Sequence, residues 1–310
     1  MIKIENYDLL RELSAVHAPS GNEAKMTEFI LDYVEKNKSG WKVVPAIIHG
    51  EDFQDCVILV FGKPKTAVYA HIDSIGFTVR YDNKLIPIGG PEAVTGFQLT
   101  GNDSKGKIET RIVADLDAGL LCCDFPREIE RGTELVFKSN WIETDSTIQN
   151  CYMDNRLGAF IALKLAEGLE NGAIVFSCYE EHGGGTVPFL VKYLWENYKI
   201  KNNLVCDITW ATEGVKLGKG VAISLRDSRI PRKSFLNKII KIARESGIQF
   251  QLEVEGSGGS DGKELQSSPY PVDWVFIGVA EENVHSPDEK VNKSDINSML
   301  ALYDVLMKCL

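Results

Sequence analysis

The sequence predicts an α/β fold in which a mostly parallel sheet, covered by helices on both faces, is interrupted by a small β-rich insert. After residue 154, helical and strand patterns alternate strictly, which is typical of a parallel sheet. Between residues 75 and 150, short β-prone segments alternate with glycine and proline turns, and no long helical period occurs. The 310 residues are 44% hydrophobic and 25% charged, as in ordinary globular proteins.

The elements follow from the spacing of apolar residues. Three- and four-residue spacing predicts helices at residues 7–18 and 23–36, and β-branched apolar runs predict strands at residues 41–48, 56–61 and 66–70. In the insert we expect strands at residues 77–81, 107–115 and 134–138. Beyond it we expect helices at residues 155–169, 186–198, 233–245 and 294–306, and strands at residues 173–179, 203–206, 221–225, 249–254 and 274–278. This order predicts one α/β domain, residues 1–74 and 150–310, interrupted by a small β domain, residues 75–149.

Composition and charge exclude several classes of protein. The net charge of −10 repels nucleic acid and anionic membrane surfaces, so we expect neither as a partner. Apolar runs such as residues 56–61 are far shorter than the roughly 18 residues that cross a bilayer. The first residues lack the pattern of a secretory signal, and the seven cysteines have no CxxC spacing. We therefore expect a cytoplasmic protein with reduced thiols.

Polar side chains gather where the predicted strands end. His71 and Asp73 follow one strand, Glu180 and Glu181 follow another, and Asp207 follows a third. Positions 154 and 180, and again 181 and 207, are 26 residues apart, about the length of one helix and one strand. Each such step returns the chain to the same rim of the sheet, where Asp154 and His285 could also reach.

Two imidazoles and three carboxylates from this set suit a pair of divalent ions, with Zn²⁺ expected first and Co²⁺ or Mn²⁺ as alternatives. One carboxylate must bridge the ions to hold them about 3.5 to 4 Å apart. If the strand conformation persists, Glu180 and Glu181 point in different directions, so one ligates and the other is a candidate general base. Asp73 can accept the free N–H of His71 and so orient it.

Each residue also has a purely structural interpretation. Asp154 alone could cap a helix, the glutamate pair could complement a helix dipole, and Asp207 or His285 could simply belong to turns. A complete set of ligands with a base at one rim favours the metal site. Residues 256–263 resemble a phosphate-binding loop, but Ser257 occupies the position of its first glycine and Glu264 that of its Ser/Thr, so the pattern fails twice.

The motifs resemble those of the co-catalytic di-metal aminopeptidases, which include glutamyl and deblocking aminopeptidases and the tetrahedral self-compartmentalising enzymes. The similarity spans nearly the whole chain. It is carried by residues 15–28, residues 70–77 (AHIDSIGF), residues 154–158 (DNRLG), residues 179–181 (YEE), Asp207, residues 259–261 (GSD) and residues 285–287 (HSP).

This resemblance implies a zinc-peptidase-like three-layer αβα domain in which Asp154 bridges two metals. It implies that His71 and Asp207 complete the coordination of one metal and that Glu181 and His285 complete that of the other. The resemblance implies that Glu180 is the general base. It also implies hydrolysis of short peptides with a free N-terminus by a homo-oligomer, such as a dodecamer, whose insert serves substrate access or oligomerisation.

The sequence departs from the family pattern at two positions, and two alternative functions remain open. Ser74 replaces a frequent acid and His182 a usual aliphatic residue, so the preferred substrate stays open. The alternatives are a di-metal deacylase or carboxypeptidase on the same core, and a non-catalytic scaffold that associates through its insert.

Overall fold

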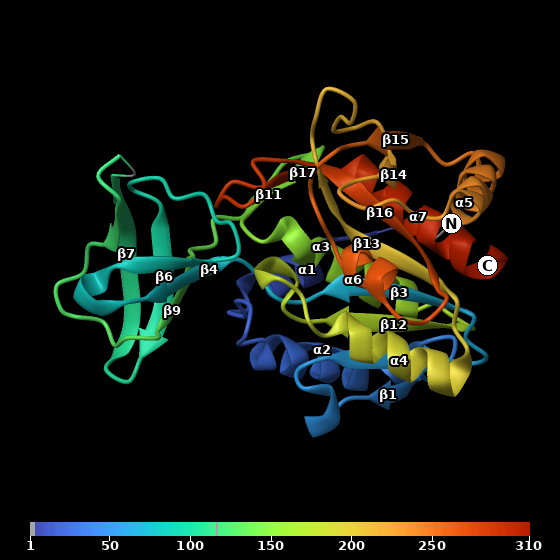
Figure 1. Ribbon diagram of the computed structural model, residues 1–310, viewed down its shortest axis with the longest axis horizontal. Coiled ribbons are helices and arrows are strands. Elements are labelled where there is room, and N and C mark those ends of the chain that lie inside the picture. The colour runs from blue at the N-terminus through green and yellow to red at the C-terminus, as the bar shows by residue number, and fades with distance from the viewer. Residues whose placement is uncertain (1–3, 116) are drawn as a thin grey trace.

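A computed structural model of the protein, described here for residues 4–115 and 117–310, contains two separate sheets (Figure 1). The larger has eleven strands in the order β1-β2-β12-β3-β13-β16-β17-β11-β10, with β14 paired to β16 and β15 to β14. The smaller has six strands in the order β5-β4-β9-β6-β7-β8 and stands to one side of the helix-covered sheet (Figure 1). The predicted combination of a mixed sheet and a small β insert is confirmed.

The centre of the large sheet is parallel: β12 pairs with β3, β3 with β13, and β13 with β16, all in the same direction. The carboxyl ends of these strands therefore meet at one edge. The strands of this sheet are β1 Ala46–Ile48, β2 Val57–Phe61, β3 Thr66–His71, β10 Ile142–Glu143, β11 Thr147–Gln149, β12 Gly172–Ser177, β13 Asn202–Trp210, β14 Val221–Arg226, β15 Phe250–Val254, β16 Asp273–Glu282 and β17 Lys290–Asn292.

Helices cover both faces of this sheet (Figure 1). The α-helices are α1 Asp8–Ala15, α2 Ala24–Asn37, α3 Met153–Ala166, α4 Val187–Tyr198, α5 Lys233–Ser246, α6 Gly262–Ser267 and α7 Lys293–Cys309, and short 3₁₀ turns include η4 Glu180–His182. On one face α3 contacts α1 and α7, and α7 contacts α5; α4 and α6 contact each other on the opposite face. Because neither face meets water, every residue of β2, β3 and β12 is buried.

The small sheet is antiparallel and has a core of its own. Its strands are β4 Gly76–Val79, β5 Leu85–Ile88, β6 Gln98–Asp103, β7 Gly106–Asp115, β8 Leu120–Cys123 and β9 Glu134–Phe137. Phe77 and Phe137 pack edge to face at its centre, with ring centroids 5.9 Å apart. β10 and β11 lie within the expected insert, yet they join the large sheet through β17. The division at residues 75–149 stays a prediction.

Two elements differ from expectation in ways that affect the site. β13 continues to Trp210, so Asp207 lies inside this strand and not beyond its end. The short helix α6 was not expected, because its sequence follows a glycine-rich stretch. Among the described residues, no helix combines the length and the apolar character needed to span a membrane.

Candidate metal centre

The structure brings all five predicted ligands together in two clusters that share Asp154. His71, Asp154 and Asp207 form one cluster, and Asp154, Glu181 and His285 form the other. In each cluster, one potential ligand atom per residue lies within 4.8 Å of the others. These residues come from five separate regions of the chain, and the parallel topology places them at one edge of the sheet.

The first cluster is built on two adjacent parallel strands. His71 is the last residue of β3 and is fully buried, with its Nε2 atom 3.1 Å from Oδ1 of Asp154 and 3.6 Å from Oδ2 of Asp207. Asp154 reaches this point from the start of α3. The three side chains therefore direct one nitrogen and two oxygens at a common centre.

The second cluster uses the other oxygen of Asp154. Nε2 of His285 lies 3.4 Å from Oδ2 of Asp154 and 3.2 Å from Oε2 of Glu181. His285 lies between β16 and β17 and has a φ of 66°, an unusual conformation for a residue other than glycine. Because its two oxygens face different histidines, Asp154 has the orientation of a bridging ligand.

Asp73 organises the surroundings of the first cluster. Its Oδ1 atom is 3.2 Å from Nδ1 of His71, as the sequence predicted for an orienting carboxylate. It also accepts the backbone N–H groups of Glu180 and Glu181, each at 3.1 Å, and the hydroxyl of Ser20 at 2.5 Å. One buried carboxylate thus fixes both the His71 ring and the loop that carries the paired glutamates.

The strand conformation does not persist through Glu180 and Glu181. Tyr179 has a φ of 66°, which turns the chain out of β12, and the glutamates lie in the 3₁₀ turn η4. The two side chains nevertheless separate. Oε2 of Glu180 lies 4.0 Å from Nε2 of His71, whereas Glu181 belongs to the second cluster.

Three buried residues that sequence reasoning did not single out hold the ligands in place. Glu289 accepts the backbone N–H of His285 at 3.0 Å and that of Asp154 at 3.3 Å, so it links both clusters. Asn155 donates to the carbonyl of Cys206, the residue before Asp207, at 2.9 Å. The guanidinium of Arg156 donates to the carbonyls of Ile72, Asp73 and Ala18.

Signals for these three residues were weak. Asn155 and Arg156 stand directly after Asp154, and that adjacency was the available signal. Glu289 follows His285 in a polar turn and looks like any solvated acid, although it is fully buried.

Burial and neighbouring charges raise the pKa values of several groups in the two clusters. Burial, and then the charge of Asp154, raise the pKa of Glu181 to about 7. Burial opposes protonation of His285, but hydrogen bonds to Asp154 and Glu181 outweigh it and raise the pKa of His285 to about 11. Burial also raises the pKa of Glu180 well above its usual range. Crowded buried carboxylates of this kind are stabilised by a positive charge.

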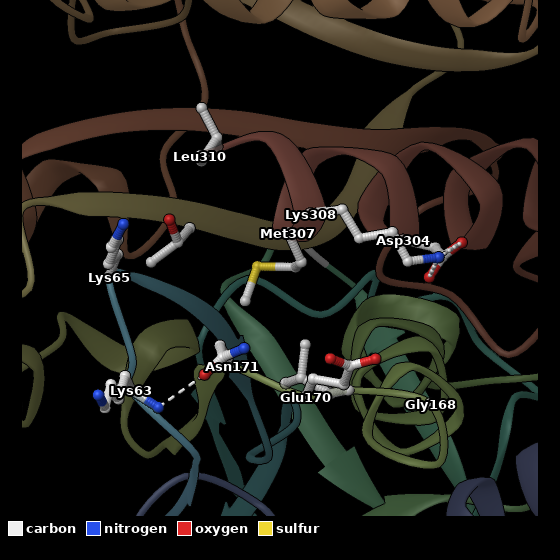
Figure 2. A pocket seen from close by; sticks show the side chains of 11 residues that line it. Lys63, Lys65, Gly168, Glu170, Asn171, Asp304, Met307, Lys308 and Leu310 are labelled. Atoms are coloured by element: carbon white, nitrogen blue, oxygen red, sulfur yellow. Dashed lines mark hydrogen bonds and ion pairs between the residues drawn. The ribbon is translucent and has the colours of Figure 1, made fainter. Parts of the chain in front are cut away.

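The clusters open on a cavity of about 350 Å³, which Asp154, Glu180, Glu181, Asp207 and His285 line on one side. Figure 2 shows a larger cavity of about 500 Å³ beside Thr66, the first residue of β3, and therefore at the opposite end of that strand from His71. Its charged lining includes Lys308, which pairs with Asp304, and none of the predicted ligands. The smaller cavity is the candidate active site.

Comparison with known proteins shows the family to which the chain belongs. The sequence profile of the M42 glutamyl aminopeptidase family matches residues 124–302, more than half of the chain. This chain belongs to the M42 glutamyl aminopeptidase family. As a member, it is a hydrolase of the metallo-aminopeptidase class. The resemblance seen in its motifs is thereby confirmed.

Relatives match the M42 chain over almost its full length. A protein of Acetivibrio thermocellus, provisionally named an aminopeptidase, is 24% identical over 96% of both chains. An aminopeptidase from the archaeon Desulfurococcus kamchatkensis is similar in structure, with a TM-score of 0.84, 21% identity and coverage of 98% of this chain and 94% of its own. The TET1 peptidase of Pyrococcus horikoshii has a TM-score of 0.78 and 21% identity, covering 96% of this chain and 98% of its own. That peptidase is described as assembling into a tetrahedron or a large octahedral shell.

Proposed function

We propose that this protein removes the N-terminal residue from short peptides at a centre that holds two divalent metal ions. The observation that carries the proposal is the position of Asp154, whose Oδ1 and Oδ2 atoms face His71 and His285 respectively. A carboxylate whose two oxygens face two different imidazoles has the arrangement expected of a ligand shared between two ions. Family membership favours an aminopeptidase over the deacylase, carboxypeptidase and scaffold alternatives.

The residues present fit such a metal pair. Each cluster offers one imidazole nitrogen and two carboxylates, a donor set that suits Zn²⁺ and, less specifically, Co²⁺ or Mn²⁺. Oε1 of Glu181 is buried and has no hydrogen-bond partner among the described residues, which leaves it free for a cation. His71 and Asp207 would hold one ion, Glu181 and His285 the other, and Asp154 both. When bound, such ions acidify a water molecule and polarise a substrate carbonyl.

The remaining chemistry belongs to side chains of this protein. Glu180 lines the cavity beside the first cluster and ligates neither proposed ion, so its carboxylate is placed to accept a proton from water and return it to the departing amine. A raised pKa suits a group that must take up a proton and release it again. Asp73 keeps His71 in the tautomer that presents Nε2 to the ion.

The likeness to TET peptidases supports two further parts of the proposal. We expect the substrates to be short peptides with a free N-terminus, and we expect several copies of the chain to assemble, as the Pyrococcus horikoshii relative does. The small β domain, residues 75–149, is the part that we assign to substrate access or oligomerisation.

Metal analysis combined with an anilide panel tests the proposal. The protein as purified, or after addition of Zn²⁺, Co²⁺ or Mn²⁺, should bind two ions per chain and hydrolyse aminoacyl-anilides but not their N-acetylated counterparts. Preferential cleavage of the acetylated substrates would show a deacylase. Absence of hydrolysis with every metal would favour the scaffold alternative and overturn the proposal.

A further inference from the structure

The cavity beside the metal centre carries more negative charge than two metal ions balance. Its lining includes no Lys or Arg. Four of its acids belong to the candidate metal centre, Asp154, Glu180, Glu181 and Asp207, and three do not, Asp227, Glu253 and Glu255. Two divalent ions are offset by the three ligand carboxylates and one hydroxide. The three additional acids are left without a counter-charge from the metals.

Glu253 and Glu255 are the acids with the least compensation. Within residues 4–115 and 117–310, no Lys, Arg or His nitrogen lies within 4.0 Å of either carboxylate. Asp227 differs, because Arg226 and Arg229 lie close enough to oppose the effect of burial, which raises its pKa. Uncompensated carboxylates in a recess attract a cation from the solution.

The position of Glu253 is fixed by the sheet. It lies on β15, is 3% exposed and accepts a hydrogen bond from the hydroxyl of Thr209 on β13. Beside it in the register of β14, the hydroxyl of Ser224 is buried and makes no hydrogen bond of normal geometry to the described residues. A rigid acceptor and an unused polar group thus lie side by side at the cavity wall.

The distance from the metals to this wall matches one side chain. Thr209 is two residues beyond Asp207 on the same strand, a step of about 6.6 Å. The four-carbon stem of lysine spans a distance of this order. An N-terminal residue held at the metal ions could therefore bring its terminal ammonium to Glu253.

Trp210 is an independent sign that a ligand occupies this cavity. It ends β13, lines the cavity and is 61% exposed, although an indole normally gains by burial. Its ring stands edge-on to that of His285, with centroids 6.4 Å apart at 75°. An exposed indole beside carboxylates is a suitable surface for the stem and the positive charge of a basic side chain.

We infer that the cavity selects peptides whose N-terminal residue is basic, lysine or arginine, through Glu253 and Glu255 with Trp210 as a packing surface. The inference rests on the proposed aminopeptidase function and deepens it. Acidic N-terminal residues would meet like charge and be disfavoured.

The test compares substrates that differ in charge but little in shape. Anilides of lysine, norleucine and glutamate are assayed with the metal-loaded protein; norleucine carries a methyl group near the position of the lysine ammonium. We expect kcat/KM for lysine to exceed that for norleucine at least about tenfold, with glutamate slowest. As a second readout, L-lysinol should inhibit more strongly than L-norleucinol.

Variants assign the preference to particular residues. Glu253→Gln and Glu255→Gln should each lower the lysine to norleucine ratio of kcat/KM at least about threefold. Glu255 is half-exposed, so its variant tests the idea even if Glu253→Gln folds poorly. The matched control Glu245→Gln, an exposed change on α5, should leave the ratio unaltered.

The possible failures are distinct. Equal rates for lysine and norleucine, or fastest cleavage of glutamate, would overturn the inference and leave the aminopeptidase standing. Cleavage of none of the three substrates would overturn the proposed function and this inference with it.

Discussion

Nδ1 of His285 lies 3.1 Å from the carbonyl oxygen of Gly90, a residue that follows β5 of the small sheet. A carbonyl only accepts hydrogen bonds, so this contact keeps a proton on Nδ1 of His285. When the ring is neutral, its lone pair is therefore on Nε2, the atom that faces Asp154 and Glu181. The preceding residue, Gly89, donates its N–H to Nδ1 of His182 at 2.9 Å. The small sheet therefore orients one proposed ligand directly and contacts the loop that carries another.

Gly89→Ala should weaken metal binding at the second cluster. Gly89 has a φ of 69°, which strains any residue other than glycine, and an added Cβ would lie 2.9 Å from Cγ2 of Ile75 and 3.0 Å from the carbonyl oxygen of Glu181. The loop must therefore shift, and with it the Gly90 carbonyl that orients His285. We expect about tenfold weaker binding of one of the two ions, measured by calorimetry. Gly40→Ala is the matched control, because a Cβ there meets no atom within 4 Å. Equal affinities in both variants would contradict an orienting role for Gly90.

Glu180→Gln should separate metal binding from turnover. Glu180 belongs to neither ligand cluster, so the variant should still bind two ions, whereas loss of the proton acceptor should lower kcat by about 10² to 10⁴. Metal analysis and steady-state kinetics on the same preparation measure both quantities. A fully active variant would remove Glu180 from the reaction, and a metal-free variant would make it a ligand.

The sequence was sufficient to place three of the proposed ligands, His71, Asp154 and Asp207, because each belongs to a strongly patterned element. His71 ends a strand of six buried residues, and Asp154 begins a long apolar helix, so their places could be read from periodicity. Asp207 was predicted as a ligand although β13 continues three residues past it. The direction of its side chain is set by the strand conformation, which is the same whether the strand ends there or continues. Topology then brought these positions to one edge.

Residues that act through tertiary contacts left no such pattern. Gly90 acts through its carbonyl, which every residue possesses, and it meets His285 from 195 positions away in the sequence. Glu289 is an acid in a polar turn, and its burial depends on two backbone N–H groups that only the folded chain supplies. Local conformation was also inaccessible: the strand predicted to run to Tyr179 ends at Ser177, and the left-handed Tyr179 leads into the turn that carries the glutamate pair.

Metal affinity should increase with pH. In the metal-free protein the pKa values of Glu181, about 7, and His285, about 11, are raised, so both groups hold protons that a cation must displace. Burial opposes protonation of His71, but Asp207, Asp154 and Asp73 raise its pKa well above its usual value, so His71 also holds a proton. Affinity should therefore rise at least about tenfold per pH unit between pH 7 and 8, and more steeply below pH 7, where Glu181 adds a further proton. Calorimetry in buffers of different ionisation enthalpy counts the protons released. An affinity independent of pH would show that the metal-free cluster is already deprotonated.

Gly158→Ala should destabilise the catalytic domain although alanine favours helices. Gly158 lies in α3 where a Cβ would collide with the carbonyl oxygen of Cys206 and with the side chain of Asn155. The gain in helix propensity is about 1 kcal/mol. Overpacking against β13, which is paired on both sides within the sheet, costs about 1 to 3 kcal/mol. Because the collision falls on the residue before Asp207, metal binding should weaken as well. Urea unfolding of the metal-free protein measures the loss; Gly256→Ala, whose Cβ would meet nothing within 4 Å, is the control. An unchanged or higher urea midpoint for Gly158→Ala would show that α3 and β13 can move apart at little cost in stability. The close approach of the two elements would then not explain why residue 158 is a glycine.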